Sequence, residues 1–233
     1  MINHLNECAS LTQSYYALRH GQSLANVAGI ISSDPKISTV QHGLSELGRE
    51  QARAAGDAFA AEYIMSSSND DYRGVAIYSS DFARARETAS IFAQRLVGGG
   101  IPLYRGGDGE GDGEIVILER RLRERYFGEL NGCTDERYGE VWDLDAVDAD
   151  HVEFGVESAN SVLERTTKFV IELDGRLSRS RTEDDASRWK CVLVAHGDVL
   201  QIMQTGFLRH EDASRHRSLR HLETATIREL ILD

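Results

Sequence analysis

Short, continuously apolar runs alternate with longer amphipathic segments along the chain. Residues 15–18, 75–78 and 191–195 contain no polar interruption, which is typical of strands buried on both faces. The alternating segment 224–232 predicts a closing strand. Two shorter apolar segments, 101–104 and 115–118, are candidates for extended structure.

The segments between these runs have helical periodicity. Ser45 favours the N-cap position of the first predicted helix, and Gly98 to Gly100 end the second. The predicted helices span residues 45–65, 81–96, 134–144, 158–177 and 198–207. The Gly- and Asp-rich segment 106–114 and the polar segment 181–187 predict solvated loops.

Strands that alternate with helices predict a mostly parallel central sheet covered by helices on both faces. The fold class is therefore α/β, a three-layer α/β/α sandwich. Neither an internal repeat nor an interdomain linker interrupts the pattern, so we expect one domain over residues 1–233. Residues 1–13 precede the first strand and are predicted to be a flexible N-terminal extension.

Composition narrows the classes of function. The chain has 233 residues, 41% of them hydrophobic, which is enough for a core without disulfide or metal support. The net charge of −12 disfavours nucleic acids and anionic membranes as partners. The three cysteines form no C-x-x-C pair, and no apolar run approaches the ~20 residues of a membrane span. We expect a cytoplasmic protein, and its oligomeric state stays open.

Polar clusters follow three of the predicted strands. They are Arg19-His20-Gly21, the segment 79–86 with Arg84, and His196-Gly197. Ligands of parallel sheets bind beyond the carboxyl ends of the strands, so we expect these clusters to meet at one edge. Arginine matches phosphate oxygens, and a histidine can act as a nucleophile toward phosphorus. Gly21 would let the backbone approach a ligand closely.

Five ordered motifs carry a resemblance that covers nearly the whole chain. They are RHGQSLAN (19–26), LSELG (44–48), SDFARARETA (80–89), LRERYFG (122–128) and AHG (195–197), with GVES (155–158) as a looser match. Together they resemble the phosphoglycerate mutase-like branch, branch 1, of the histidine phosphatase superfamily. The resemblance implies a phosphoglycerate mutase-like fold and phosphoryl transfer through a phosphohistidine.

The resemblance also implies a role for each matched residue. His20 is expected to be the phosphorylated nucleophile, and Glu124 the proton donor to the leaving oxygen. The expected phosphate- or substrate-binding residues are Arg19, Gly21, Asn26, Arg84, Arg125, His196 and Gly197. Arginines and imidazoles already supply positive charge, so we expect neither a metal ion nor a cofactor.

Several of these residues have a plainer interpretation. Arg86 is expected to be a surface charge beside Arg84. Glu124 lies in a run of charged residues that solvent alone could explain, and Arg125 is either a substrate contact or a partner for Glu124. The basic residues between Arg215 and His221 are expected to form a solvated turn, and a place at the pocket mouth is the alternative.

The resemblance leaves the acceptor of the phosphoryl group open. Residues 133–155 hold eight acidic residues against one arginine, Arg137, which disfavours the highly anionic substrate of a mutase. We therefore expect a metal-independent phosphatase for a small phosphorylated metabolite. A cofactor-dependent phosphoglycerate mutase or a sugar bisphosphatase is the alternative, and a non-catalytic phosphate-binding scaffold is a further one. Loops 133–157 and 209–221 are expected to set specificity.

Overall fold

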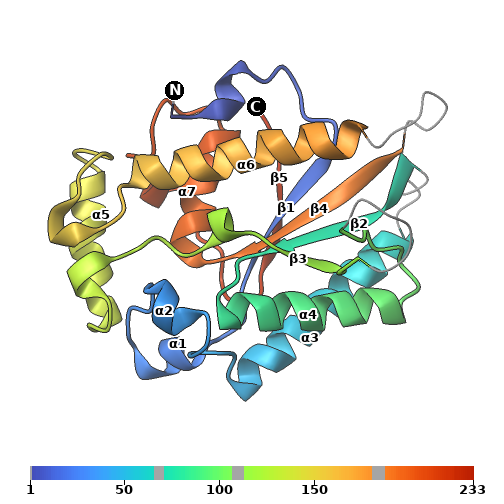
Figure 1. Cartoon of the computed structure of the whole chain (residues 1–233), viewed down its shortest axis with the longest axis horizontal. Helices are drawn as coiled ribbons and strands as arrows, with labels where there is room; N and C mark the ends of the chain where they lie inside the picture. Colours follow the sequence, from blue (N-terminus) through green and yellow to red (C-terminus); the bar gives the residue numbers. More distant parts are fainter. Residues whose placement is uncertain (1, 66–70, 107–112, 180–186) are drawn as a thin grey trace.

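The computed structural model describes residues 2–65, 71–106, 113–179 and 187–233 (Figure 1). Five strands form one sheet in the order β3-β2-β4-β1-β5. Their bounds are β1 Ser14–Arg19, β2 Tyr72–Ser79, β3 Val116–Leu118, β4 Arg188–Ala195 and β5 Ile227–Leu230. The pairs β1–β4, β2–β4 and β2–β3 are parallel, and β5 lies antiparallel to β1 at one edge.

Helices cover both faces of this sheet, so the predicted three-layer α/β/α architecture is confirmed. The helices are α1 Leu24–Ala28, α2 Pro35–Ser38, α3 Glu46–Met65, α4 Ala83–Gly98, α5 Tyr138–Asp145, α6 Ala159–Arg179 and α7 Gly197–Phe207. Alternate strand residues separate the core in two. Leu193 packs on the side of α6 and α7, whereas Val192 and Val194 pack on the side of α3 and α4.

The sheet register aligns the carboxyl ends of the three central strands. Arg19 at the end of β1 pairs with Ala195 at the end of β4, and Ser79 at the end of β2 pairs with Val194. The backbone N–H of His20 donates to the carbonyl of Ala195 over 3.0 Å. The three polar clusters therefore meet at one edge of the sheet, as the sequence predicts.

Some elements differ from the prediction. Residues 101–104 form only an isolated bridge, between Leu103 and Val75. The helices α1 and α2 are too short for a recognisable periodicity. The Ser23–Asn26 capping box starts α1, and Asp34 caps α2. The predicted helix 134–144 opens with a 3₁₀ turn, Asp135–Arg137, before α5 begins.

The segment before β1 is packed against the domain rather than extended away from it, which corrects the predicted flexible extension over residues 1–13. Leu5 is fully buried in the core beneath α6 and α7. The Asn3 amide donates to the carbonyls of Gly206 and His210. The predicted loops 106–114 and 181–187 fall largely outside the described residues. No helix in the described part of the chain is long and apolar enough to cross a membrane.

Candidate active site

A cavity of about 310 Å³ opens beyond the carboxyl ends of the central strands. It is lined by Arg19, His20, Ser23, Ala25, Asn26, Ile30, Ser32, Arg84, Glu124, Asp135, Tyr138, Trp142, Gly197, Asp198, Arg217 and His221. Most of the residues singled out from the motifs are in this set. The exceptions are His196, which lies just beneath it, and Gly21 and Arg125.

His20 is buried directly after the end of β1, and its two ring nitrogens make different contacts. Its Nδ1 lies 2.7 Å from the carbonyl of Gly21, an acceptor, so Nδ1 carries the proton. Its Nε2 therefore has the lone pair and accepts from Arg84 Nε over 3.1 Å. Burial, reinforced by the charges of Arg84 and Arg19, holds the pKa of His20 well below its usual 6.5. The imidazole is neutral at physiological pH, as a nucleophile requires.

Three buried nitrogens around His20 have no hydrogen-bond partner among the described residues. They are Arg19 Nε, Arg84 Nη1 and His196 Nδ1. Leaving a buried donor unpaired costs about 1–3 kcal/mol, so their convergence indicates a ligand that satisfies them together. A tetrahedral oxyanion has the right shape and charge for two guanidinium groups and an imidazole.

His196 is positioned by a serine from the neighbouring strand. Its ring centroid lies 5.1 Å from that of His20. Ser80 Oγ is 2.9 Å from His196 Nε2 and also accepts from the backbone N–H of Phe82. We assign the Ser80 hydroxyl as the donor to Nε2, because no other acceptor for it is found among the described residues, and this assignment leaves His196 Nδ1–H as a donor. Burial and the charge of Arg84 keep the pKa of His196 well below 6.5.

Glu124 is a buried carboxyl group of the cavity wall. The charged residues beside it form surface ion pairs, Arg121 with Glu119 and Arg123 with Asp81, while Glu124 is only 9% exposed. Burial and the nearby Asp198 carboxylate raise the pKa of Glu124 to about 7, against the opposing effect of Arg84. The raised pKa favours the protonated carboxyl group near neutral pH, as a general acid needs.

Asn26 and Gly197 both reach the cavity. Asn26 Oδ1 accepts from Ser23 N and Ser23 Oγ, so its amide nitrogen is the group left to donate to a ligand. A Cβ atom on Gly197 would lie 3.2 Å from Arg19 Cζ. Gly197 thus lets the Arg19 guanidinium pack against the start of α7.

The structure differs from the prediction for Gly21 and Arg125. Gly21 lies outside the cavity lining, and a Cβ there would collide with the carbonyl of Gly48 at the start of α3. Close helix packing, not ligand approach, therefore requires this glycine. The Arg125 side chain is fully buried, and its nitrogens lie 2.6 and 2.8 Å from the Asp145 carboxylate. It is a structural cation, and only its backbone N–H contacts Glu124. Arg86 is exposed, as predicted.

Residues that sequence reasoning did not single out form the mouth of the cavity. Asp135, Tyr138 and Trp142 come from the acidic segment 133–155, and Arg217 and His221 come from the basic segment. The solvated turn expected for that basic segment is therefore wrong for Arg217 and His221, which border the cavity. Both loops expected to set specificity thus reach the cavity.

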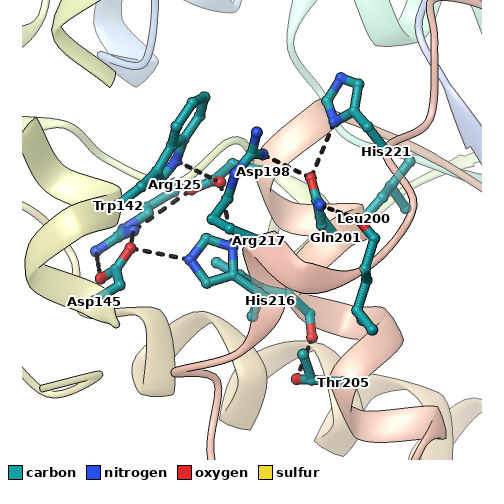
Figure 2. Close-up of polar contacts among 12 residues, drawn as sticks. Arg125, Trp142, Asp145, Asp198, Leu200, Gln201, Thr205, His216, Arg217 and His221 are labelled. Carbon is teal, nitrogen blue, oxygen red and sulfur yellow. Dashed lines mark hydrogen bonds and ion pairs between the residues drawn. The ribbon is translucent and has the colours of Figure 1, made fainter. Parts of the chain in front are cut away.

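Gln201 on α7 lies between Arg217 and His221 of this mouth and contacts both (Figure 2). Its amide nitrogen donates to the carbonyl of Leu219, which fixes Oε1 as the acceptor for Arg217 Nη1 at 2.7 Å and His221 Nδ1 at 2.9 Å. With its Nδ1 protonated, His221 accepts from Arg19 Nη1 through Nε2 over 2.7 Å. The orientation of Arg19 therefore depends on Gln201.

The described residues contain no cluster of three or more His, Cys, Asp or Glu side chains suited to a metal ion. The arginine and imidazole nitrogens that line the site match phosphate oxygens in charge and geometry.

Comparison with known proteins matches almost the whole chain to one family. Residues 15–104 and 107–233 match the family model of the histidine phosphatase superfamily (branch 1). Glucosyl-3-phosphoglycerate phosphatase of Mycobacterium tuberculosis (strain ATCC 25618 / H37Rv) is 30% identical over 199 residues, covering 82% of this chain and 74% of that protein. A 2,3-bisphosphoglycerate-dependent phosphoglycerate mutase of Parvibaculum lavamentivorans is 32% identical over 127 residues, 54% of this chain and 47% of that protein.

Solved structures give the same relationship. The native structure of a mycobacterial glucosyl-3-phosphoglycerate phosphatase superposes with a TM-score of 0.67 at 25% identity, covering 93% of this chain and 89% of that one. The complex of a mycobacterial glucosyl-3-phosphoglycerate phosphatase with inorganic phosphate superposes with a TM-score of 0.66 at 25% identity, covering 93% and 88%.

Proposed function

Because the chain belongs to the histidine phosphatase superfamily, branch 1, we propose that it is a phosphatase in which His20 accepts the phosphoryl group of a small phosphomonoester. His20 Nε2 attacks phosphorus while the bond to the leaving oxygen breaks, and protonated Glu124 gives its proton to that oxygen. Water then attacks the phosphohistidine and loses a proton to the Glu124 carboxylate. The products are an alcohol and inorganic phosphate, and both side chains return to their starting states.

The observation that carries this proposal is the set of three unpaired buried nitrogens around His20, whose Nε2 is unprotonated and accepts from Arg84 Nε. Arg19 Nε, Arg84 Nη1 and His196 Nδ1 are ready to bind the three non-bridging oxygens of a transferring phosphoryl group. Preorganised donors of this kind are the main source of catalysis in phosphoryl transfer. A scaffold that only bound phosphate would gain nothing from a neutral nucleophile beside a protonated carboxyl group.

Hydrolysis is favoured over mutase chemistry by the lining of the cavity mouth. The segment 133–155 contributes Asp135, Tyr138 and Trp142 to the cavity, and its one arginine, Arg137, is paired with Glu140 instead. Segment 133–155 therefore contributes no cation to the cavity, and Arg217 of the other loop lies beside the carboxylates of Asp135 and Asp198, which disfavour retention of a doubly phosphorylated intermediate. Glucosyl-3-phosphoglycerate, the substrate in the name of the mycobacterial relatives, is the natural first compound to assay.

The proposal is tested by hydrolysis of p-nitrophenyl phosphate in excess EDTA. Wild type is expected to turn over at the same rate with and without EDTA, because arginines supply the positive charge. His20→Ala is expected to lower kcat at least about a thousandfold, since the nucleophile is lost. His4→Ala is the histidine control. His4 lies in the N-terminal segment and does not line the cavity, so this variant should keep wild-type activity.

Two results would contradict the proposal. Full activity in His20→Ala would remove His20 from the mechanism, and loss of activity in EDTA would overturn metal independence. Interconversion of phosphoglycerates faster than their hydrolysis would instead identify a mutase.

A further inference from the structure

Gln201 is a buried amide on α7 that does not itself line the cavity. Its side chain is only 1% exposed, yet it contacts two residues of the cavity wall, Arg217 and His221 (Figure 2). A side chain in this position cannot touch a ligand in the cavity. Any influence of Gln201 on a ligand is therefore transmitted through its neighbours.

Two opposite partners fix the orientation of the Gln201 amide. Its nitrogen donates to the carbonyl of Leu219 over 2.8 Å, and its oxygen accepts from Arg217 Nη1 over 2.7 Å. Arg217 is always a donor, and its Cζ is held 3.6 Å from the centroid of the Trp142 ring. A reversed amide would set oxygen against oxygen at Leu219 and donor against donor at Arg217. The Gln201 oxygen is thus a fixed acceptor.

His221 lies between this oxygen and the phosphate-binding Arg19. Its Nδ1 is 2.9 Å from Gln201 Oε1, and its Nε2 is 2.7 Å from Arg19 Nη1, which can only donate. The neutral imidazole with its proton on Nδ1 is the one form that satisfies both contacts. In a protonated imidazole Nε2 would also be a donor, and two positive charges would face each other at hydrogen-bond distance.

The charges around His221 favour this neutral form. Burial, together with Arg19 at the end of β1 and Arg217 in segment 209–221, lowers the pKa of His221 from its usual 6.5. Glu223, two residues further along, and Asp198 on α7 oppose that shift. The amide that contacts Nδ1 adds no charge of its own. A carboxylate in its place would stabilise the imidazolium and raise the pKa.

Arg19 depends on His221 for the edge that it presents to a ligand. Its Nη1 donates both to His221 Nε2 and to the carbonyl of Leu222 over 2.8 Å. Its Nε is buried and has no partner among the described residues, so the edge formed by Nε and Nη2 is left for two phosphate oxygens. Without the His221 acceptor, the guanidinium group loses one of the two contacts that hold this edge in place.

We propose that Gln201 is a positioning residue for phosphoryl binding, whose neutral amide keeps His221 an uncharged acceptor and thereby fixes the edge of Arg19 that meets the phosphoryl oxygens. This inference rests on the proposed function and adds a residue that acts on the phosphate through two others. The charge at position 201 consequently decides whether phosphate binding withstands mild acid.

Calorimetric titration of inorganic phosphate between pH 6 and pH 9 tests this role, because it measures binding without turnover. Gln201→Glu keeps the acceptor for His221 and adds a negative charge beside it. We expect its dissociation constant to stay within about threefold of wild type at pH 9 and to exceed it about tenfold or more at pH 6, where His221 becomes charged. Taking the ratio to wild type at each pH removes the ionisation of phosphate itself.

Removing the titrating group should rescue this variant. In Gln201→Glu combined with His221→Gln, the new amide oxygen can accept from Arg19 and does not ionise, so the loss of binding at pH 6 should disappear. Gln204→Glu is the matched control, because Gln204 lies three residues further along α7, outside the cavity, and its oxygen accepts from Arg228. Its ratio to wild type should stay constant with pH.

Gln201→Met is a second variant, similar in length but without the amide. His221 then loses the acceptor that selects its tautomer, so phosphate should bind about tenfold more weakly at pH 7. Wild-type affinity in Gln201→Met would contradict the proposal. So would a ratio for Gln201→Glu that is the same at pH 6 and pH 9, because a purely structural defect weakens binding at both.

These binding measurements also separate the positioning role from the proposed function. If wild type lacks phosphatase activity but phosphate binding depends on Gln201 as expected, the proposed function fails and the positioning role stands. If hydrolysis depends on His20 and the Gln201 variants bind phosphate like wild type at every pH, only the positioning role fails.

Discussion

At the scale of single residues, burial shifts the pKa values of His20 and Glu124 in directions that suit opposite roles. It disfavours the charged form of each group, so the imidazole keeps its lone pair and the carboxyl group keeps its proton. Arg84 contacts His20 and lowers the pKa of both groups. Even so, the pKa of Glu124 stays raised, at about 7. A nucleophile and an acid are thus present together near neutral pH.

The pH dependence of kcat/KM follows from this pair. Only protonated Glu124 can donate to a leaving alkoxide, so kcat/KM for an alkyl phosphate such as 3-phosphoglycerate should fall as pH rises above about 7. His20 stays neutral well below its ordinary pKa and does not limit activity in that range. Steady-state kinetics between pH 5.5 and pH 9 check this expectation.

Glu124→Gln tests whether the fall in kcat/KM above pH 7, the alkaline limb of the profile, is caused by deprotonation of Glu124. Loss of the acid should lower kcat/KM for the alkyl phosphate about a hundredfold or more and flatten the profile above pH 7. Glu129→Gln, an exposed glutamate five residues on, should retain the wild-type profile. A limb that persists unchanged in Glu124→Gln would assign the titration to another group.

Motifs locate functional residues better than they locate what each side chain touches. The sequence places His20, Arg84 and Glu124 correctly at the cavity, because strand ends and motif spacing fix those positions. It does not reveal that Gly21 packs against Gly48 or that Arg125 pairs with Asp145. Those contacts join residues far apart in the chain, and no local pattern encodes them.

At the scale of elements, α5 is held by one buried carboxylate at its last residue. Asp145 accepts from Arg125, from His216 Nε2 at 3.1 Å and from His151 Nε2 at 2.9 Å. This helix carries Tyr138 and Trp142 into the cavity. Anchoring Asp145 therefore also positions the wall on which Arg217 rests.

Replacing Asp145 should destabilise the fold in a pH-dependent way. Burial would raise its pKa, but hydrogen bonds from His216 and Arg125 lower it from the ordinary 3.8 to about 2. The stabilisation is thus complete above about pH 4 and is lost as pH falls toward 2. At pH 7, Asp145→Asn should cost about 3 kcal/mol, because the buried Arg125 loses its bidentate carboxylate partner and keeps only the longer 3.5 Å contact with Asp198.

Urea unfolding of wild type and Asp145→Asn at pH 7 and pH 3 measures this effect. The difference between them should narrow by about 1 kcal/mol at pH 3, roughly half of the pH-linked part. Asp143→Asn, on the exposed side of the same helix, should stay within about 0.5 kcal/mol of wild type at both pH values. A gap between wild type and Asp145→Asn that does not change with pH would contradict the linkage.

Periodicity predicts the elements that bury a face and misses those that depend on capping. The strands at 15–18, 75–78 and 191–195 and the helices α3, α4, α6 and α7 follow from their apolar patterns. In contrast, α1 has five residues and α2 has four, less than two turns each. Polar caps and tertiary contacts decide such short helices, and these signals are weak in a sequence.

At the scale of the whole molecule, the segment before β1 belongs to the largest of the three hydrophobic clusters that the described residues form. Leu5 is fully buried with residues of α6 and α7, and Thr12 N and Gln13 N donate to Asp174 on α6. Figure 1 shows this N-terminal segment passing over α6 and α7. The sequence did not reveal this, because a single buried leucine among polar residues has no periodicity.

Leu5→Ala should therefore lower stability as a core substitution does. Removing a fully buried leucine costs about 2–5 kcal/mol, whereas a flexible extension would tolerate the change. Thermal and urea unfolding provide the measurement. Leu47→Ala, at a leucine that is 49% exposed, is the control and should change stability much less. A Leu5→Ala variant as stable as wild type would contradict this packing and support the flexible extension predicted from the sequence.

The place of β4 in the sheet governs when the protein can fold during synthesis. β4 pairs with both β1 and β2, which do not pair with each other. It begins at residue 188, more than 100 residues after β2 ends at Ser79. At typical translation rates that interval lasts roughly 5 to 20 seconds. Throughout it, two apolar strands leave the ribosome with unpaired edges, which makes the nascent chain prone to aggregation and a ready client for chaperones.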